Sequence, residues 1–255
     1  MGETKVTKVP DWRALASTTA SSLNNIIRLR TELVRDFPLF SQIPPEDCSK
    51  IVAAAHERSY LRDRAIYFEG DPVKQVILLT SGCVKLSQTG PQGQEVILRL
   101  VGSGECLGAE CFPIHTHCST AQTMKPATAL VWEASQFEAL AERFPVLGRN
   151  ISCVLLQTLN QLEIRFREMC TEKVAPRLVN QLVRLVNQVG ERTNGHVEIG
   201  LSQRDLAQLT GTTLFTVSRL LGQWQELGIV RPKRQGLLIL NVPALEEISR
   251  AEELD

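Results

Sequence analysis

Residues 201–240 read LSQRDLAQLTGTTLFTVSRLLGQWQELGIVRPKRQGLLIL, and this stretch decides the fold of the chain. The pattern predicts a short helix, a tight turn, a second helix and a two-stranded wing. Ser202 and Asp205 have the spacing of a capping box at the start of the first helix. Gly211 can adopt the positive φ that a tight turn needs, and Thr213 is a good N-cap for the second helix. This order of elements is typical of a DNA-reading module.

The second helix is expected to have two different faces. Its apolar face has the spacing i, i+3, i+4, i+7 and consists of Val217, Leu220, Leu221 and Trp224. The opposite side carries Phe215, Ser218, Arg219 and Gly222. One face can therefore pack on the domain while the other enters a groove of DNA. Two short helices and a hairpin also occur in modules that bind proteins, so the charge pattern must be considered as well.

Basic residues gather in this segment although the whole chain has a formal net charge of +0. Arg219 has the planar fork that suits guanine, Ser218 can reach either base, and Phe215 can contact a thymine methyl or pack back against the wing. Thr216 lies on the same turn of the helix. The residues expected to contact phosphates are Ser202, Gln203, Thr213, Lys233 and Arg234. Affinity for double-stranded DNA would thus come from a local patch.

Composition indicates a globular protein of about two domains, with 255 residues, 43% hydrophobic and 22% charged. No apolar run reaches the ~18 residues that span a bilayer, and the N-terminus lacks the apolar stretch of a secretory signal. Seven cysteines without a regular spacing argue against a disulfide framework. We therefore expect a cytoplasmic protein with reduced thiols and no membrane partner.

Turn signals divide the chain into four parts and predict an α+β fold. Residues 1–35 begin with a polar tail and continue with helical periodicity, which predicts an N-terminal helical extension. Residues 36–145 contain short strand-like runs separated by glycine turns, as in a small barrel or sandwich. Residues 146–172 are expected to form a long helix, and residues 173–255 the DNA-binding domain.

The long helix carries a candidate dimer seam. Apolar residues alternate at spacings of four and three, as in a coiled coil: Leu155, Leu159, Leu162, Phe166 and Met169. The opposite face is charged, with Glu163, Arg165, Arg167 and Glu168. Such a stripe also occurs in helices that pack within one chain, but a parallel homodimer is the preferred prediction. Two reading helices related by a two-fold axis fit an inverted-repeat operator.

Further motifs complete a family resemblance. They are Phe68-Glu69-Gly70-Asp71, Ser81-Gly82, Gly93, Gly104-Glu105 and Thr216-Val217-Ser218-Arg219-Leu220-Leu221. In this order the chain resembles the cyclic-AMP receptor protein and fumarate–nitrate reductase regulator family of bacterial transcription factors, over about residues 36–245. The resemblance implies an N-terminal cyclic-nucleotide-binding-like β-roll that senses a signal and a dimerisation helix. It also implies a C-terminal winged helix-turn-helix that binds a palindromic promoter site and contacts RNA polymerase.

Two departures from the family pattern argue against cyclic AMP as the effector. Members that bind it place a Gly-Glu pair and an Arg-Ser pair around the ribose and the phosphate. The corresponding positions here are Gly108-Ala109 and Ser119-Thr120, and Leu162-Glu163 aligns with the adenine-facing pair. Glu110 could supply the carboxylate with a one-residue shift, but nothing nearby in the sequence replaces the arginine. The expected effector pocket comprises Gly108, Ala109, Glu110, Ser119, Thr120 and Leu162.

A loop at residues 106–118 suggests a different sensor. It brings Cys106, Cys111, His115, His117 and Cys118 within 13 residues. Thiolates and imidazoles this close could ligate zinc, an iron–sulfur cluster or haem iron, or the cysteines could pack inside while the histidines are solvated. Iron–sulfur members of the family carry an N-terminal cysteine trio, and residues 1–47 contain no cysteine. Two hypotheses remain beside the packing alternative: haem ligation by a histidine, or a thiol redox switch.

The sequence therefore predicts a homodimeric transcription regulator, not an enzyme, that changes shape at a hinge near residues 170–173. Two alternatives stay open. One is an effector-independent regulator whose pocket is filled by its own side chains. The other is a nucleotide-binding regulatory subunit of an enzyme, although the chain has no Walker loop, nucleophile elbow or paired acid–base spacing.

Overall fold

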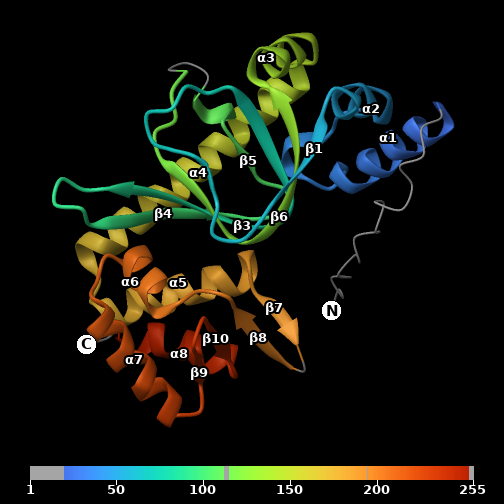
Figure 1. Cartoon of the computed structure of the whole chain (residues 1–255). Coiled ribbons are helices and arrows are strands. Elements are labelled where there is room, and N and C mark those ends of the chain that lie inside the picture. Colours follow the sequence, from blue (N-terminus) through green and yellow to red (C-terminus); the bar gives the residue numbers. More distant parts are fainter. Residues whose placement is uncertain (1–19, 112–114, 194, 253–255) are drawn as a thin grey trace.

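The computed structural model describes residues 20–111, 115–193 and 195–252, and its elements form an α+β fold in two lobes joined by a long helix (Figure 1). The N-terminal extension contributes helix α1 (Ala20–Val34), and residues 1–19 of that extension lie outside the described residues. Helix α1 packs beside α2 (Pro45–Ala53), after the short 3-10 helix η2 (Pro38–Phe40). Among the described helices, none is long and apolar enough to cross a membrane.

An antiparallel β-roll forms the upper lobe. Its strands are β1 (His56–Tyr60), β2 (Ala65–Tyr67), β3 (Gln75–Thr89), β4 (Glu95–Val101), β5 (Cys106–Leu107) and β6 (Thr120–Glu133). The sheet order is β1-β6-β3-β4, with β2 added to β6 and β5 added to β3. Register shifts interrupt the β3–β6 pairing on both sides of Gly82, where the two long strands bend. The expected barrel or sandwich is thus a rolled sheet.

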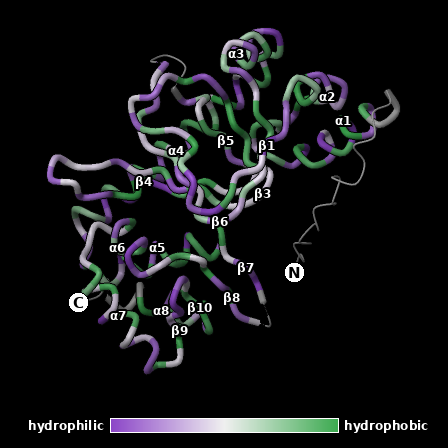
Figure 2. Tube along the Cα trace, viewed as in Figure 1, coloured by the Kyte–Doolittle hydropathy of each residue, from purple (hydrophilic) through white to green (hydrophobic). Residues whose placement is uncertain are grey.

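Apolar side chains on the two faces of this sheet build two cores. One core lies inside the roll and includes Leu79, Val101 and Leu107. The other packs the outer face against α2, α3 (Ala134–Arg143) and the start of α4 (Pro145–Thr171), with Trp132 at its centre. The buried Trp132 indole donates a hydrogen bond to the Ile51 carbonyl at 2.9 Å. Figure 2 shows the contrast between these hydrophobic strands and the hydrophilic turn between β3 and β4.

The lower lobe is a helix-turn-helix domain with a winged sheet. It comprises α5 (Val174–Gln188), β7 (Glu191–Thr193), β8 (His196–Ile199), α6 (Gln203–Thr210), α7 (Leu214–Glu226), β9 (Val230–Lys233), β10 (Gly236–Ile239) and α8 (Val242–Glu252). The predicted two-stranded wing is β9–β10. It belongs to a larger sheet of order β7-β8-β10-β9, because the preceding hairpin pairs with β10. The sequence argument missed this hairpin.

The two lobes share apolar packing. Ile97 and Leu100 of β4 join a buried cluster with Leu182 and Leu185 of α5 and Leu206 of α6. Burial of this apolar surface holds the lower lobe against the roll. Strand β4 is therefore part of both the upper lobe and its interface with the lower lobe.

Gly82→Ala is expected to reduce the free energy of unfolding by more than about 2 kcal/mol, because a side chain there must adopt a strained backbone and displace its neighbours. The φ of Gly82 is +91°, and a Cβ atom would lie 2.5 Å from the Pro126 carbonyl oxygen. Gly70→Ala is the matched control, since φ is +86° there but nothing lies within 4 Å. Urea unfolding of both variants measures the difference. Equal losses would contradict the packing argument.

Candidate DNA interface and sensor cavity

The caps of the helix-turn-helix are formed as the sequence predicts. The Ser202 hydroxyl accepts a hydrogen bond from the Asp205 backbone N–H at 3.2 Å, and the Asp205 carboxylate accepts from the Ser202 N–H at 2.8 Å. Gly211 has φ +60° at the end of α6. The Thr213 hydroxyl caps α7 by accepting from the Thr216 N–H at 3.2 Å. These local contacts fix the angle at which α7 leaves the turn.

Helix α7 presents a free face. Its predicted apolar residues Val217, Leu220, Leu221 and Trp224 are all buried. Ser218, Arg219 and Gly222 are exposed on the other side. Phe215 is 78% exposed and so does not pack back against the wing. The helix can therefore offer a guanidinium, a hydroxyl and an aromatic ring to a groove.

The candidate phosphate contacts differ in their environment. The Lys233 ammonium is paired with the Glu198 carboxylate at 2.8 Å, so part of its charge is already compensated. Arg234, at the turn of the wing, is exposed and has no side-chain partner among the described residues. The Thr213 hydroxyl is also engaged with that of Thr216 at 2.9 Å, whereas Gln203 is half-buried at the start of α6. Arg234 is thus the freest cation for a phosphate.

The charged face of α4 holds the two lobes together. Glu168 is only 3% exposed, and its two carboxylate oxygens accept from the Arg184 guanidinium of α5, each at 2.7 Å. Arg165 donates to the backbone carbonyls of Leu98 in β4 and Leu209 in α6. Burial lowers the pKa of Arg165 to about 10, and the neighbouring Arg184 contributes in the same direction. Of the four charged residues named on this helix, Arg165 and Glu168 thus form internal contacts, whereas Glu163 and Arg167 are exposed.

The predicted dimer-seam residues are exposed in the single chain. This holds for Leu155, Leu159, Leu162, Phe166 and Met169, with Phe166 at 70%. Met169 also lies near the helix-turn-helix, since a Cβ atom at Gly211 would be 2.9 Å from its terminal methyl. An apolar stripe of this length on one helix face is rarely left exposed to solvent in a folded protein.

A small cavity lies between the roll and α4, which we call the sensor cavity. Its volume is about 20 Å³, and its lining consists of Leu39, Arg99, Cys106, Ala109, Glu110, Ile151, Val154, Leu155 and Thr158. Of the predicted effector-pocket residues, Ala109 and Glu110 line it. Gly108, Ser119, Thr120 and Leu162 do not. The long helix contributes residues one to three turns before the aligned Leu162.

Ser119 and Thr120 support the neighbouring turn instead. The Thr120 hydroxyl accepts a hydrogen bond from the Glu69 backbone N–H at 3.1 Å, and Ser119 is buried. The Asp71 carboxylate accepts from the Phe68 N–H at 2.8 Å within that turn. The side chains at the aligned phosphate positions are therefore part of the framework of the roll.

The sequence argument did not consider Arg99, whose side chain lines the sensor cavity. This residue lies on β4, and its guanidinium is 4.0 Å from the Glu110 carboxylate and 3.4 Å from the Glu105 carboxylate. Burial raises the pKa of Glu110, and the nearby Arg99 opposes that shift. The signal in the sequence was an arginine in the middle of the apolar strand EVILRLV. An alignment of motifs could not reveal that its side chain reaches the cavity.

Among the described residues, the cysteines and histidines of positions 106–118 lie in different environments. Cys106 is buried, and burial raises the pKa of its thiol. His115 and Cys118 are exposed, and the side chain of Cys111 lies outside the described residues. Within the part of the chain that the structure describes, no three histidines, cysteines or carboxylates could hold one metal ion.

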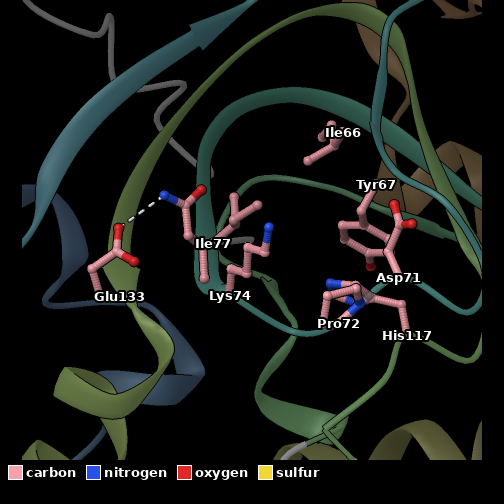
Figure 3. A pocket seen from close by; sticks show the side chains of 9 residues that line it. Ile66, Tyr67, Asp71, Pro72, Lys74, Ile77, His117 and Glu133 are labelled. Carbon is pink, nitrogen blue, oxygen red and sulfur yellow. Dashed lines mark hydrogen bonds between the residues drawn. The ribbon is translucent and has the colours of Figure 1, made fainter.

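His117 is buried and not solvated as the packing alternative assumed. It is 5% exposed and its ring stacks on Tyr67, with centroids 3.4 Å apart and planes within 6°. Burial lowers its pKa. It borders a cavity of about 380 Å³ where Lys74 lies between the two rings and Glu133 (Figure 3). This charged lining does not fit haem, which needs an apolar cleft.

Comparison with known proteins agrees with this two-lobe geometry. Residues 57–144 match the cyclic nucleotide-binding domain, and residues 176–248 match the Crp-like helix-turn-helix domain. A cyclic AMP receptor protein of Thermus thermophilus is 27% identical over 83% of this chain and 96% of its own length. A global nitrogen regulator of Synechocystis is 26% identical over 73% of this chain and 85% of its own.

Solved structures show the same fold. FixK2 from Bradyrhizobium japonicum superposes with a TM-score of 0.68 at 22% identity, covering 76% of this chain and 96% of that one. CLP from Xanthomonas campestris, a c-di-GMP responsive global regulator, gives 0.67 at 19% identity, covering 77% and 99%. The fold and the exposed reading helix define a DNA-binding regulator with a sensor-type β-roll. The chain belongs to the family of transcription regulators related to the cyclic AMP receptor protein and the fumarate–nitrate reductase regulator.

Thiol labelling of the native protein is expected to separate its cysteines by burial. Cys118, Cys153 and Cys170 should react rapidly with a maleimide at neutral pH, because they are exposed. Cys48, Cys83 and Cys106 should react only on unfolding, since burial blocks access and raises the pKa of each thiol. Peptide mapping by mass spectrometry assigns each site. Rapid labelling of Cys106 in the folded protein would contradict its placement.

Proposed function

We propose that this protein is a homodimeric transcription regulator, not an enzyme, that binds an inverted-repeat operator in double-stranded DNA. The observation that carries the proposal is the exposed face of α7, held by capped helix ends in a domain of the Crp-like type. Its family also supports contact with RNA polymerase. The rival reading as a regulatory subunit of an enzyme would need a catalytic chain as partner, and the helix-turn-helix gives it no role.

Dimerisation would use the apolar stripe of α4. Five large apolar side chains are exposed there, whereas Arg165 and Glu168 of the same helix are engaged within the chain, so a second copy is the natural partner for the stripe. A parallel pair of α4 helices relates two copies of α7 by a two-fold axis. Each α7 would then read one half-site.

Base reading would depend on three side chains. Arg219 would donate to guanine O6 and N7, Ser218 would bond to a neighbouring base, and Phe215 would contact a thymine methyl. Arg234, Ser202 and Gln203 would position the domain on phosphates. The lysine on the wing, Lys233, would do so only by releasing Glu198.

Control would come from the sensor cavity. Relatives include proteins named for cyclic AMP and for c-di-GMP, but Ala109 and Ser119 remove the carboxylate and guanidinium expected around cyclic AMP. A cavity of about 20 Å³ also supports the alternative of an effector-independent regulator, because it is nearly filled. Thiol or haem sensing at residues 106–118 receives no support from the separated positions of His115, His117 and Cys106.

Arg219→Ala is expected to weaken operator binding by ~1–3 kcal/mol and to relax discrimination at one guanine, because a bidentate arginine carries about that much specificity. Arg234→Ala is the matched control and should weaken all duplexes alike, reducing the salt slope by about one unit. The operator is first selected from random duplexes with the unmodified protein. Competition binding at several salt concentrations then measures both variants. Equal losses of specific and random affinity for Arg219→Ala would show that it does not read bases.

Leu162→Asp is expected to separate the dimer, because a carboxylate in an apolar seam must either lose its charge or keep the helices apart. Leu162→Met, which preserves the apolar character, is the control. Sedimentation at micromolar concentration measures the mass of each variant. A dimer that survives Leu162→Asp would move the interface away from α4.

Cyclic AMP is expected not to bind at micromolar concentration, since Ala109 and Ser119 stand at the positions that align with the ribose carboxylate and the phosphate guanidinium of cyclic-AMP-binding members. Isothermal titration of the dimer with cyclic AMP is the measurement. Tight binding of one molecule per subunit would show that Glu110 and Arg99 replace the missing pair.

A further inference from the structure

Arg99 is half-buried and only loosely held. Its guanidinium is 3.4 Å from Glu105 and 4.0 Å from Glu110, and the side chain is 19% exposed. The Arg184–Glu168 pair shows the contrast, with two hydrogen bonds of 2.7 Å. A guanidinium divided between two carboxylates at long distances retains hydrogen-bonding capacity for an additional acceptor.

Glu105 links this guanidinium directly to the DNA-binding lobe. One of its carboxylate oxygens faces Arg99, and the other accepts from the Gly102 N–H at 2.6 Å and from the Gln188 amide at 3.1 Å. The Gln188 amide of α5 also donates to the Leu100 carbonyl of β4 at 2.9 Å. A change in the position of Arg99 therefore changes the charge that holds the C-terminal end of α5 on β4.

Two other contacts of the DNA-binding lobe fall on the same strand. Gln208 of α6 donates to Glu95 at 3.1 Å, and Arg165 connects the Leu98 carbonyl with the Leu209 carbonyl. Strand β4 thus carries Arg99 on the side of the sensor cavity and the attachment points of α5 and α6 along its length. Displacement of this strand would therefore also shift the helix-turn-helix.

The sensor cavity is so small that any ligand must move the residues around it. About 20 Å³ holds little more than one water molecule, so an effector must move Arg99 or push α4 from the roll. An anion would find the guanidinium as its charge partner. Burial raises the pKa of Glu110, whose carboxyl group lies 4.0 Å from the Arg99 guanidinium.

We infer that Arg99 recognises an anionic effector in the sensor cavity and transmits its binding to the DNA-binding lobe through Glu105 and Gln188. The inference rests on the proposed function, because it names the class of ligand and the route of control for the same regulator. When the anion attracts Arg99, Glu105 loses its partner, and the attachment of α5 to β4 changes. The anion then shifts the balance between lobe arrangements with different affinity for the operator.

A tethered anion tests this route without knowledge of the effector. Thr158 lines the cavity from α4, so Thr158→Asp puts a carboxylate beside Arg99, and Thr158→Asn has the same shape without the charge. The operator Kd of the two variants should differ by at least about fivefold, the lower end of measured allosteric couplings. In an Arg99→Gln background, and in a Gln188→Ala background, that difference should disappear.

A second variant covers the case in which Thr158→Asp does not fold, as judged by circular dichroism. Glu110→Gln removes the carboxylate that already faces Arg99, so it should change the operator Kd in the direction opposite to Thr158→Asp, and only when Arg99 is present. Glu32→Gln is the surface control, because that carboxylate pairs with Arg28 on α1 far from the cavity and should leave the Kd unchanged.

The outcomes are distinct. Equal Kd values for Thr158→Asp and Thr158→Asn overturn the inference, as does a difference that persists without Arg99. An unaltered Kd for Glu110→Gln also overturns it. Failure of the unmodified protein to select any inverted repeat would refute the proposed function itself, which the Arg219 and Leu162 variants test separately.

Discussion

The pairing of Glu168 with Arg184 is the interaction on which the arrangement of the two lobes depends. Glu168 is near the C-terminal end of α4 and almost fully buried, and both of its oxygens accept hydrogen bonds from the Arg184 guanidinium of α5. Removing one partner of a buried pair typically costs about 3–5 kcal/mol, and less where one partner reaches solvent. Arg184 is 32% exposed. Because the chain turns at Glu172, between these helices, the pair sets the angle at which α5 leaves α4.

This constraint makes α4 a helix with two separate roles. Two of its charged residues make contacts within the chain, Glu168 with α5 and Arg165 with β4 and α6. Its apolar face is left exposed over about four turns, as expected of a surface that a second subunit covers. A movement of the helix relative to the roll would then affect both the seam and the position of the reading helix.

The same geometry explains why the sensor cavity is well placed to control the position of the DNA-binding lobe. It lies where the roll, the 3-10 helix η3 (Ala109–Cys111) and α4 meet, and β4 contributes Arg99 to it while also contacting α5 and α6. A small change of charge at this point acts on packed elements, which shift between discrete arrangements and do not deform gradually. The residues that line the larger cavity around Tyr67 and His117 all belong to the upper lobe.

The sequence by itself determined the features that depend on residues close together in the chain. The capping box at Ser202, the turn at Gly211 and the two faces of α7 follow from spacings of three and four residues, and the structure confirms each of them. The family and the α+β class followed from the same local patterns, whereas the β7–β8 hairpin did not. The tertiary structure decided the contacts across long separations. Arg165 meets a carbonyl 67 residues away, Arg99 reaches the cavity from a largely apolar strand, and His117 is buried against Tyr67. Periodicity shows which face of an element is apolar, but the partner of a charged side chain depends on how the elements cross, and that emerges only when the chain is folded.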